Sequence, residues 1–274
     1  MTALLFVFGA AFGSFFNVVA LRHTPGGALF GSHLFGRSRC SSCRRTLQWY
    51  ELVPIASFVA QLGRCRSCGA RVSVQYPIVE LLAGAVVAGA YAAYGATPFA
   101  LVWALIGLTL LLLSVVDALH FIIPDSLNLT LAALGIALLF VAHPAGSASV
   151  SSLGYFAYWL GAPESVFMSR LLGALAGGGF FALVILGTGG RAMGWGDAKL
   201  ALVGGVILGF PDIGLAAALS FILGTIAVLP LLATGRRSLR DLLPFGPFLA
   251  LGIALTAFFG YDILKVYFSL FGIL

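Results

Sequence analysis

Long apolar stretches recur along the whole chain and leave few folds open to it. A helix needs about 20 predominantly apolar residues to cross the hydrocarbon core of a bilayer, and about eight such runs can be placed in this sequence. The runs cover residues 3–21, 77–94, 99–116, 126–142, 171–188, 198–210, 213–233 and 247–260. The chain is 61% hydrophobic, which is typical of polytopic membrane proteins. The sequence therefore predicts an all-α polytopic membrane protein with about eight transmembrane helices.

One sizeable polar segment interrupts the apolar runs and divides the chain into three parts. Residues 1–21 are predicted to form the first transmembrane span, and residues 22–74 a polar insertion. Residues 75–274 are predicted to form a membrane domain with the remaining seven spans. Within that domain, residues 143–168 are small, polar and aromatic, which indicates an extramembrane loop.

The basic residues predict the orientation of the spans. The 22–74 segment contains eight arginines and a single acid, Glu51. If this segment is cytoplasmic and the spans alternate, 13 of the 15 basic residues face the cytoplasm, as the positive-inside rule favours. The net charge of +6 is thus explained by topology and membrane lipid, and no basic stripe with interleaved aromatic residues indicates nucleic acid. This orientation places Asp117, Asp125 and Asp197 at the cytoplasmic membrane face.

Two of these aspartates suit hydrolytic chemistry. Asp197 follows Gly194 and Gly196 in a Gly-x-Gly-Asp motif before an apolar run, and Asp117 ends another run. An ionised carboxylate can take a proton from water while a protonated partner donates to a carbonyl oxygen. Free N–H groups at the start of a helix, and nearby Lys199, would favour an ionised Asp197. From spacing alone, a helix N-cap explains Asp197 equally well, and an interfacial position explains Asp117.

The other acids carry less specific signals. Asp125 follows Pro124 and fits a helix N-cap better than a catalyst. Glu80 and Asn17 lie inside predicted spans, where an unpaired polar group is costly, so a paired or functional role is expected for them. Three further aspartates are expected to be solvated: Asp212, Asp241 and Asp262.

The four cysteines of the chain form two Cys-x-x-Cys pairs in the polar insertion. Cys40 and Cys43 make the first pair, Cys65 and Cys68 the second, and 21 residues separate the pairs. This pattern is typical of a tetrahedral zinc site with four thiolate ligands. Two disulfides are the alternative, which a reducing cytoplasm disfavours. Four protein ligands leave no open position, so we expect a structural metal that stabilises a segment too small for a core of its own.

Six short motifs follow one another along nearly the whole chain. They are residues 13–19 (Gly-Ser-Phe-Phe-Asn-Val-Val), the double Cys-x-x-Cys segment, residues 76–82 (Tyr-Pro-Ile-Val-Glu-Leu-Leu), Asp117 with residues 123–125 (Ile-Pro-Asp), residues 194–200 (Gly-Trp-Gly-Asp-Ala-Lys-Leu) and residues 244–248 (Pro-Phe-Gly-Pro-Phe). In this order the motifs resemble those of the bacterial type IV prepilin peptidase family, the prepilin leader peptidase/N-methyltransferases. Gln75 departs from the family pattern, which has Arg at this position.

The resemblance implies a membrane aspartyl endopeptidase of the bacterial inner membrane. Such an enzyme cuts the basic leader from type IV prepilins or pseudopilins at the cytoplasmic face. By this resemblance Asp117 and Asp197 are the catalytic pair. Supporting roles fall to Gly194, Gly196, Lys199 and Asp125. Asp125, another acid near the catalytic face, or anionic lipid headgroups are expected to meet the positive charges of the leader, because the insertion is itself basic.

The resemblance also implies a second activity. Members of the family methylate the newly formed N-terminus with S-adenosylmethionine as methyl donor. In the family the zinc-binding segment is associated with methylation, and here Gly63 takes the position of a glycine that matters for it. Asn17 and Glu80 match motif positions that we associate with the same half-reaction. The sequence carries no indication of the oligomeric state.

Two other functions remain to be weighed. Intramembrane aspartyl proteases of the presenilin-like group share the Gly-x-Gly-Asp motif, but the double Cys-x-x-Cys insertion argues against that group. A metal transporter with a cysteine sensor loop would need polar residues deep in several spans, and these are scarce in this sequence.

Overall fold

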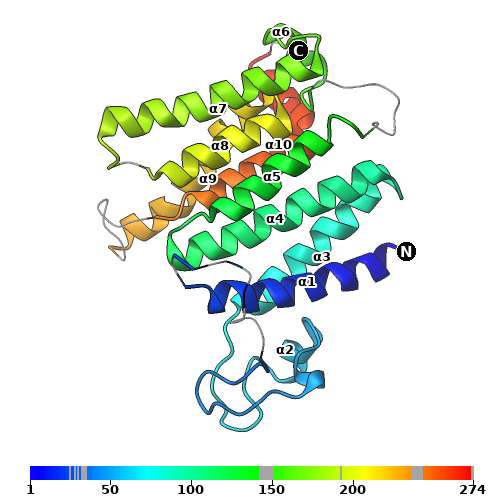
Figure 1. The fold of residues 1–274 in the computed structure, drawn as a ribbon, viewed down its shortest axis with the longest axis vertical. Helices are drawn as coiled ribbons and strands as arrows, with labels where there is room; N and C mark the ends of the chain where they lie inside the picture. The colour runs from blue at the N-terminus through cyan, green and yellow to red at the C-terminus, as the bar shows by residue number, and fades with distance from the viewer. Residues whose placement is uncertain are drawn as a thin grey trace. The chain divides into compact units, whose positions relative to one another are not determined.

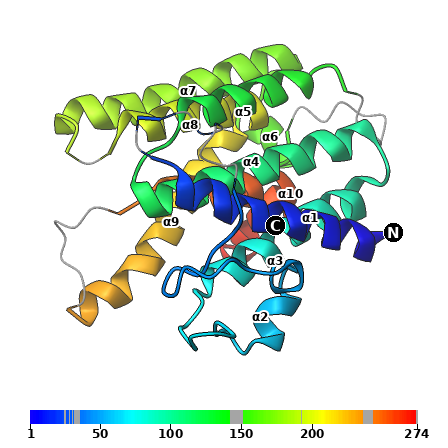
Figure 2. The same cartoon turned by 60° about the horizontal axis from the view of Figure 1, so that its bottom comes forward.

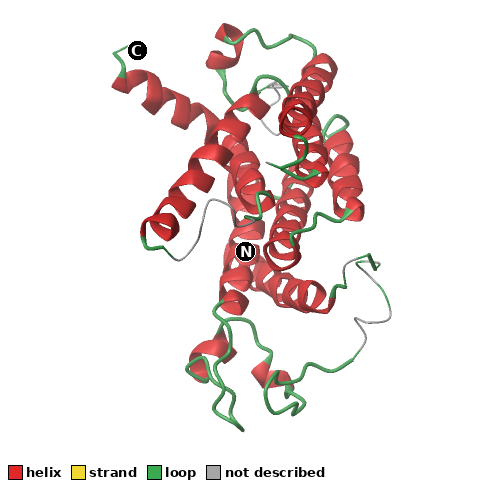
Figure 3. Ribbon diagram, turned by 90° about the vertical axis from the view of Figure 1, so that its left-hand side faces the viewer, coloured by secondary structure: helices red, strands yellow, loops and turns green. Residues whose placement is uncertain are grey.

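The computed structural model describes residues 1–274 except 25, 28, 30, 32–35, 142–150, 192, 236–242 and 273–274. The described residues form helices joined by turns and loops, with no β-strand among them (Figure 3). The chain divides into two compact units, Met1–His120 and Phe121–Leu274. The prediction of an all-α protein is therefore confirmed.

The first unit consists of three long helices and the polar insertion. Helices α1 (Thr2–Arg22), α3 (Gln75–Tyr94) and α4 (Pro98–His120) pack against one another (Figure 1). The insertion connects α1 to α3, and its described part contains two short helices, η2 (Trp49–Glu51) and α2 (Ala56–Ala60). Figure 2 shows the insertion from a second direction, with α2 apart from the long helices.

A glycine lets α1 and α3 approach each other closely. A Cβ atom on Gly13 would lie 2.7 Å from Glu80 Cα and 2.7 Å from the carbonyl oxygen of Val79. Small residues at such crossings allow helix backbones to come into contact, which drives packing inside a membrane. Because the helices are this close, the side chains of Asn17 and Glu80 are both buried.

The described residues of the second unit form six helices. They are α5 (Asp125–Ala137), α6 (Tyr155–Trp159), α7 (Val166–Thr188), α8 (Trp195–Leu208), α9 (Asp212–Ala233) and α10 (Gly246–Leu270). Helix α8 packs against both α7 and α5, and α9 packs against α10. The contact of α7 with α8 needs glycine, since a Cβ on Gly205 would lie 2.1 Å from the carbonyl oxygen of Gly173.

Six helices of the described chain are long and apolar enough to cross a membrane: α1, α3, α4, α7, α9 and α10. Every predicted apolar run contains a helix, but α5 has 13 residues and α8 has 14. Both are shorter than the roughly 20 residues of a straight span. The count of eight spans therefore remains a prediction.

The predicted loop at 143–168 is shorter at its C-terminal end than expected. Residues 143–150 lie outside the described residues. Helix α6 falls within the rest of the segment, and α7 already begins at Val166, five residues before the predicted run at 171–188. The charge of Arg170 delimited the predicted run, whereas the helix continues through this arginine.

Candidate metal and active sites

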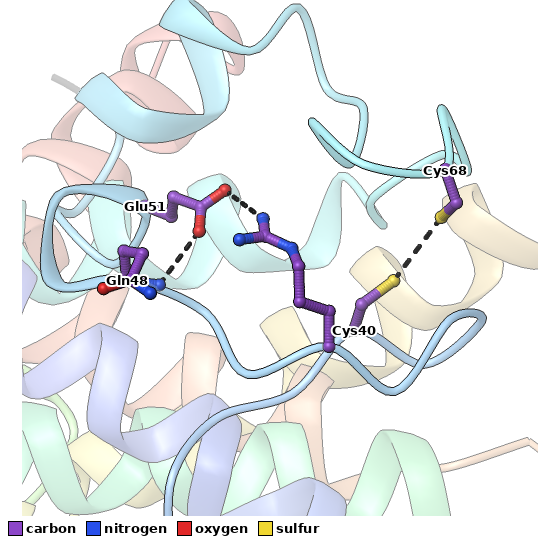
Figure 4. Close-up of polar contacts among 5 residues, drawn as sticks. Cys40, Gln48, Glu51 and Cys68 are labelled. Atoms are coloured by element: carbon purple, nitrogen blue, oxygen red, sulfur yellow. Dashed lines mark hydrogen bonds and ion pairs between the residues drawn. The ribbon is translucent and has the colours of Figure 1, made fainter.

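The four cysteines come together, as their spacing predicts. One ligand atom from each lies within 4.8 Å of all the others, and the Sγ atoms of Cys40 and Cys68 are 3.8 Å apart (Figure 4). Zinc–sulfur bonds of about 2.3 Å in a tetrahedron require sulfur–sulfur separations of about 3.8 Å. The cysteines are not paired as disulfides. The residues present thus fit a tetrahedral metal ion.

Two similar backbone turns present the cysteines. In the first, Cys40 N–H donates to Arg45 O, and in the second Cys65 N–H donates to Ala70 O. The residue four positions after the first cysteine takes a left-handed conformation in both turns, with φ 57° at Arg44 and 69° at Gly69. This repetition explains why two Cys-x-x-Cys pairs converge on one point.

The electrostatics of the cluster favour thiolates only in part. N–H groups of Cys68 and Ser67 donate to the Cys65 sulfur and lower its pKa to about 6. The Ala70 N–H acts on Cys68 in the same direction, but burial and the neighbouring sulfurs prevail and raise its pKa to about 11. Several thiolates this close repel one another, so four of them require a cation between them.

An ion pair between the partly exposed Arg45 and the buried Glu51 holds the first turn against η2. Arg45 Nη2 lies 2.6 Å from Glu51 Oε1, and Gln48 N–H donates to Glu51 Oε2 at 2.9 Å (Figure 4). The Gln48 N–H, followed by Arg45, holds the pKa of the Glu51 carboxyl below its usual value. Sequence reasoning missed this pair, although the single acid among eight arginines was a usable signal.

A hydrogen bond between Ile55 and Glu80 joins the insertion to α3. Ile55 N–H donates to Glu80 Oε2 at 2.7 Å. Ile55 has φ 62°, a strained conformation for a β-branched residue, and the bond to Glu80 stabilises it. The paired role expected for Glu80 is thus found within the described residues.

Asn17 is also paired inside the first unit. Its Nδ2 donates to Gly13 O at 3.2 Å and to Tyr76 O at 3.4 Å. Gln75 Nε2 donates to Asn17 Oδ1 at 3.3 Å. Gln75, the residue that departs from the family pattern, therefore contacts one of the predicted functional residues.

Gly63 shapes the end of α2. Its φ is 64°, and a Cβ atom there would lie 3.0 Å from the Phe58 ring. Its N–H donates to Phe58 O and its carbonyl accepts from Val72 N–H. Gly63 thus directs the chain from α2 into the turn that carries Cys65 and Cys68.

Asp117 lies in the last turn of α4 and is 4% exposed. His120, one turn further on, is 2.8 Å from the carbonyl oxygen of Ala20 through its Nε2. The rings of His120 and His23 are in edge-to-face contact. The buried acid therefore lies where the end of α4 is bound to the end of α1.

Asp197 lies in the first turn of α8, where its Oδ2 accepts from Gly194 N–H at 3.3 Å. Gly196 allows a close approach, because a Cβ there would lie 3.1 Å from Ile123 Cβ. Lys199 Nζ is 2.7 Å from Asp125 Oδ1, and both side chains are exposed. The partner of Lys199 recorded in the structure is therefore Asp125.

Asp212 is not solvated, which corrects the expectation from sequence. It is 1% exposed and accepts hydrogen bonds from the hydroxyls of Ser151 and Ser152 and from Ser152 N–H. Arg170 lies close enough to act on it electrostatically. Asp262 is exposed as expected, and Asp241 lies outside the described residues.

These observations define a class of protein: a helical protein with six potential membrane-spanning helices, a four-cysteine cluster able to hold a metal, and a Gly-x-Gly-Asp motif at the start of a helix. Two family models match the chain. The bacterial peptidase A24 N-terminal domain matches residues 7–94, and the type IV leader peptidase family matches residues 104–229. The chain belongs to the type IV leader peptidase family.

Curated relatives agree with these matches. A prepilin leader peptidase/N-methyltransferase of Bacillus subtilis is 34% identical over 97% of this chain and 98% of its own length. A protein of the same name from Pseudomonas putida is 31% identical over 94% of this chain and 90% of its own length. A third, from Pseudomonas aeruginosa, is 31% identical over 86% of this chain and 76% of its own length. No solved structure matches the chain.

Proposed function

We propose that this chain removes the leader peptide from prepilins or pseudopilins and then methylates the new N-terminus. The observation that carries the proposal is the full-length match to a prepilin leader peptidase/N-methyltransferase, which covers 97% of this chain and 98% of the relative. The comparisons lend no support to a presenilin-like protease or a metal transporter. The name of the family and six apolar helices support a membrane-bound enzyme.

We assign peptide hydrolysis to Asp117 and Asp197. Both fall inside the part of the chain that matches the leader peptidase family, and each lies at the end of its helix. Asp197 is the better candidate to activate water, because the Gly194 N–H and the N-terminus of α8 stabilise a carboxylate. Asp117 would then donate a proton to the carbonyl oxygen of the scissile bond.

Lys199 and Asp125 support this site indirectly. Their ion pair joins the start of α8 to the start of α5 and so helps to position the first turn that carries Asp197. A basic leader that docks at Asp125 must compete with Lys199 for the carboxylate. We therefore infer that leader binding and the position of α8 are linked.

The methylation half is assigned to the first unit. Cys40, Cys43, Cys65 and Cys68 would hold a structural zinc ion, for which their sulfur geometry is suited. S-adenosylmethionine would supply the methyl group. Among the described residues, the buried carboxylate of Glu80 and carboxamide of Asn17 suit a cationic donor and an amine acceptor.

The proposed location is the bacterial inner membrane, with the aspartates at the cytoplasmic face. The distribution of basic residues supports this orientation, because it places the arginine-rich insertion inside the cell.

The test is incubation of purified enzyme with a prepilin and labelled S-adenosylmethionine, with cleavage and methyl transfer read separately. Asp117→Asn and Asp197→Asn are expected to lower the cleavage rate by about 10²–10⁴-fold, the usual contribution of acid–base catalysis. Asp262→Asn, at an exposed position of α10, is the matched control. Cleavage near the wild-type rate in either catalytic variant, with the protein still folded, would refute the assignment.

A further inference from the structure

The insertion exposes large apolar side chains in and around its two short helices. Trp49 is 79% exposed, Val59 64% and Leu62 86%. The segment between them reads Leu-Val-Pro-Ile-Ala-Ser-Phe-Val-Ala at residues 52–60, without a charge. Val59 lies in the last turn of α2 and Leu62 two residues after its end, and both side chains are exposed. An apolar surface of this kind on a small polar module indicates that something covers it.

The hydrogen bond from Ile55 to Glu80 shows where the apolar segment 52–60 lies along the axis of α3. Glu80 is five residues into α3, about 7.5 Å along the helix axis from its first residue. Its side chain leans toward the N-terminus of α3, so the carboxylate lies near the first turn of the span. Because Ile55 N–H is 2.7 Å from that carboxylate, α2 begins at the boundary of the apolar part of α3.

The arrangement of helices in the first unit agrees with this position of α2 along the long helices. In Figures 1 and 2 α1 runs across the view, and α2 lies apart from it, at a position between the two ends of α1 along its length. Helix α2 is therefore not held beyond the helix ends, where water would surround it.

The charge around the apolar segment is suited to anionic lipid. Six arginines of the insertion are exposed: Arg37, Arg39, Arg44, Arg64, Arg66 and Arg71. The only acid of the insertion, Glu51, is buried and bound to Arg45. Arg66 lies over the Tyr50 ring at 5.1 Å, which keeps a cation next to the exposed aromatic residues. Basic residues beside an interfacial apolar surface bind anionic headgroups.

We propose that residues 49–62 lie in the boundary between lipid headgroups and acyl chains, and that the exposed arginines of the insertion bind anionic lipid. The zinc module would then be a membrane-surface module that is held on three sides, by α1, by α3 and by lipid. This goes beyond the proposed activities and does not depend on them.

Lipid contact can be measured by placing tryptophan reporters on the insertion. Leu62→Trp tests the apolar segment, and Ser42→Trp, at an exposed position in the first cysteine turn, is the matched control. Each variant is reconstituted in bilayers with phosphatidylglycerol and with phosphatidylcholine brominated near the headgroup. The wild-type emission spectrum is subtracted, because the chain has four tryptophans of its own.

Leu62→Trp is expected to emit at shorter wavelength than tryptophan in water and to be quenched by the brominated lipid at least twice as strongly as Ser42→Trp. Emission as in water would overturn the proposal. Short-wavelength emission without quenching would overturn it too, since a protein partner or a second copy would then cover the segment.

A second measurement tests whether the arginines of the insertion bind anionic lipid. The emission of Trp49, obtained as the difference between wild type and Trp49→Phe, should shift to shorter wavelength as the phosphatidylglycerol fraction rises. The shift should shrink in Arg64→Gln/Arg66→Gln. No dependence on anionic lipid in the wild type would overturn the arginine part of the proposal.

Discussion

Replacing Gly63 by alanine should weaken the zinc module by an amount that can be worked out from the geometry. Gly63 has φ 64°, and the left-handed conformation costs an L-residue roughly 1–2 kcal/mol. The new Cβ would also lie 3.0 Å from Phe58 Cζ, which adds about 1 kcal/mol, at the low end of overpacking costs because the Phe58 ring is partly exposed and can shift. The sum is about 2–3 kcal/mol.

Gly69 provides the matched control for this substitution. Its φ is 69°, but a Cβ there would meet nothing within 4 Å. Arg44 occupies the equivalent position in the first cysteine turn with φ 57°. This type of turn therefore tolerates a side chain at the position of Gly69. Gly69→Ala should therefore cost only the backbone contribution, about 1–2 kcal/mol.

The assay is competition for zinc with a chelator in the full-length protein. Because metal affinity includes the folding free energy of the module, Gly63→Ala should lower zinc affinity about 30- to 150-fold, at 1.4 kcal/mol for each factor of ten. Gly69→Ala should lower it about 5- to 30-fold. Phe58→Leu added to Gly63→Ala should recover the steric part. Equal affinities in the two alanine variants would refute the reasoning from the Phe58 contact.

Four further predictions concern polar contacts of the two units. Asp125→Asn should raise KM for a substrate with a basic leader but not for one with a neutral leader. Lys199→Met should change the free energy of unfolding by less than about 1 kcal/mol, because the pair with Asp125 is exposed. The pKa of Glu51 is lowered in the folded state, so its contribution to stability is complete above about pH 4.5 and is lost as pH falls through the lowered pKa. In Arg45→Met that loss of stability should occur at higher pH. Acid denaturation of the metal-free protein measures this, and superimposable curves of stability against pH for wild type and variant would contradict the ion pair. Glu80→Leu should destabilise the insertion by about 1–3 kcal/mol, because it leaves the Ile55 N–H without an acceptor. Glu80→Gln should keep the fold in thermal unfolding, and equal melting temperatures of the two variants would argue against this bond.

The helices and the cysteine cluster could be predicted from sequence, because each depends on residues that are close together in the chain. Apolar length predicts a helix wherever a span is needed, so the run at 3–21 anticipates α1 (Thr2–Arg22). Paired Cys-x-x-Cys motifs bring their ligands together because each pair is one turn of chain. The repeated left-handed residue at Arg44 and Gly69 is the structural form of that rule.

The tertiary contacts of Arg170 and Asp212 could not be predicted in this way, because their partners are distant in the chain. Arg170 was taken as the limit of a span, and Asp212 as a solvated residue, because hydropathy treats each charge as exposed. In the structure Asp212 is buried among the hydrogen-bond donors of Ser151 and Ser152, and Arg170 acts on it from α7. A charge with a partner of opposite sign can lie inside a helical bundle, and the partner is not visible in a local window.

The division of chemistry along the chain leads to a last expectation. All four cysteines, Gly63, Asn17 and Glu80 fall within residues 7–94, which match the N-terminal family model. Asp117 and Asp197 fall within residues 104–229, which match the peptidase model. The hydrogen bond of Ile55 N–H to Glu80 connects the insertion to a buried polar residue of α3. Removing the metal should therefore disturb Glu80 and methyl transfer first, while cleavage continues. A chelator that stopped cleavage and methylation in parallel would show instead that the aspartates depend on the module.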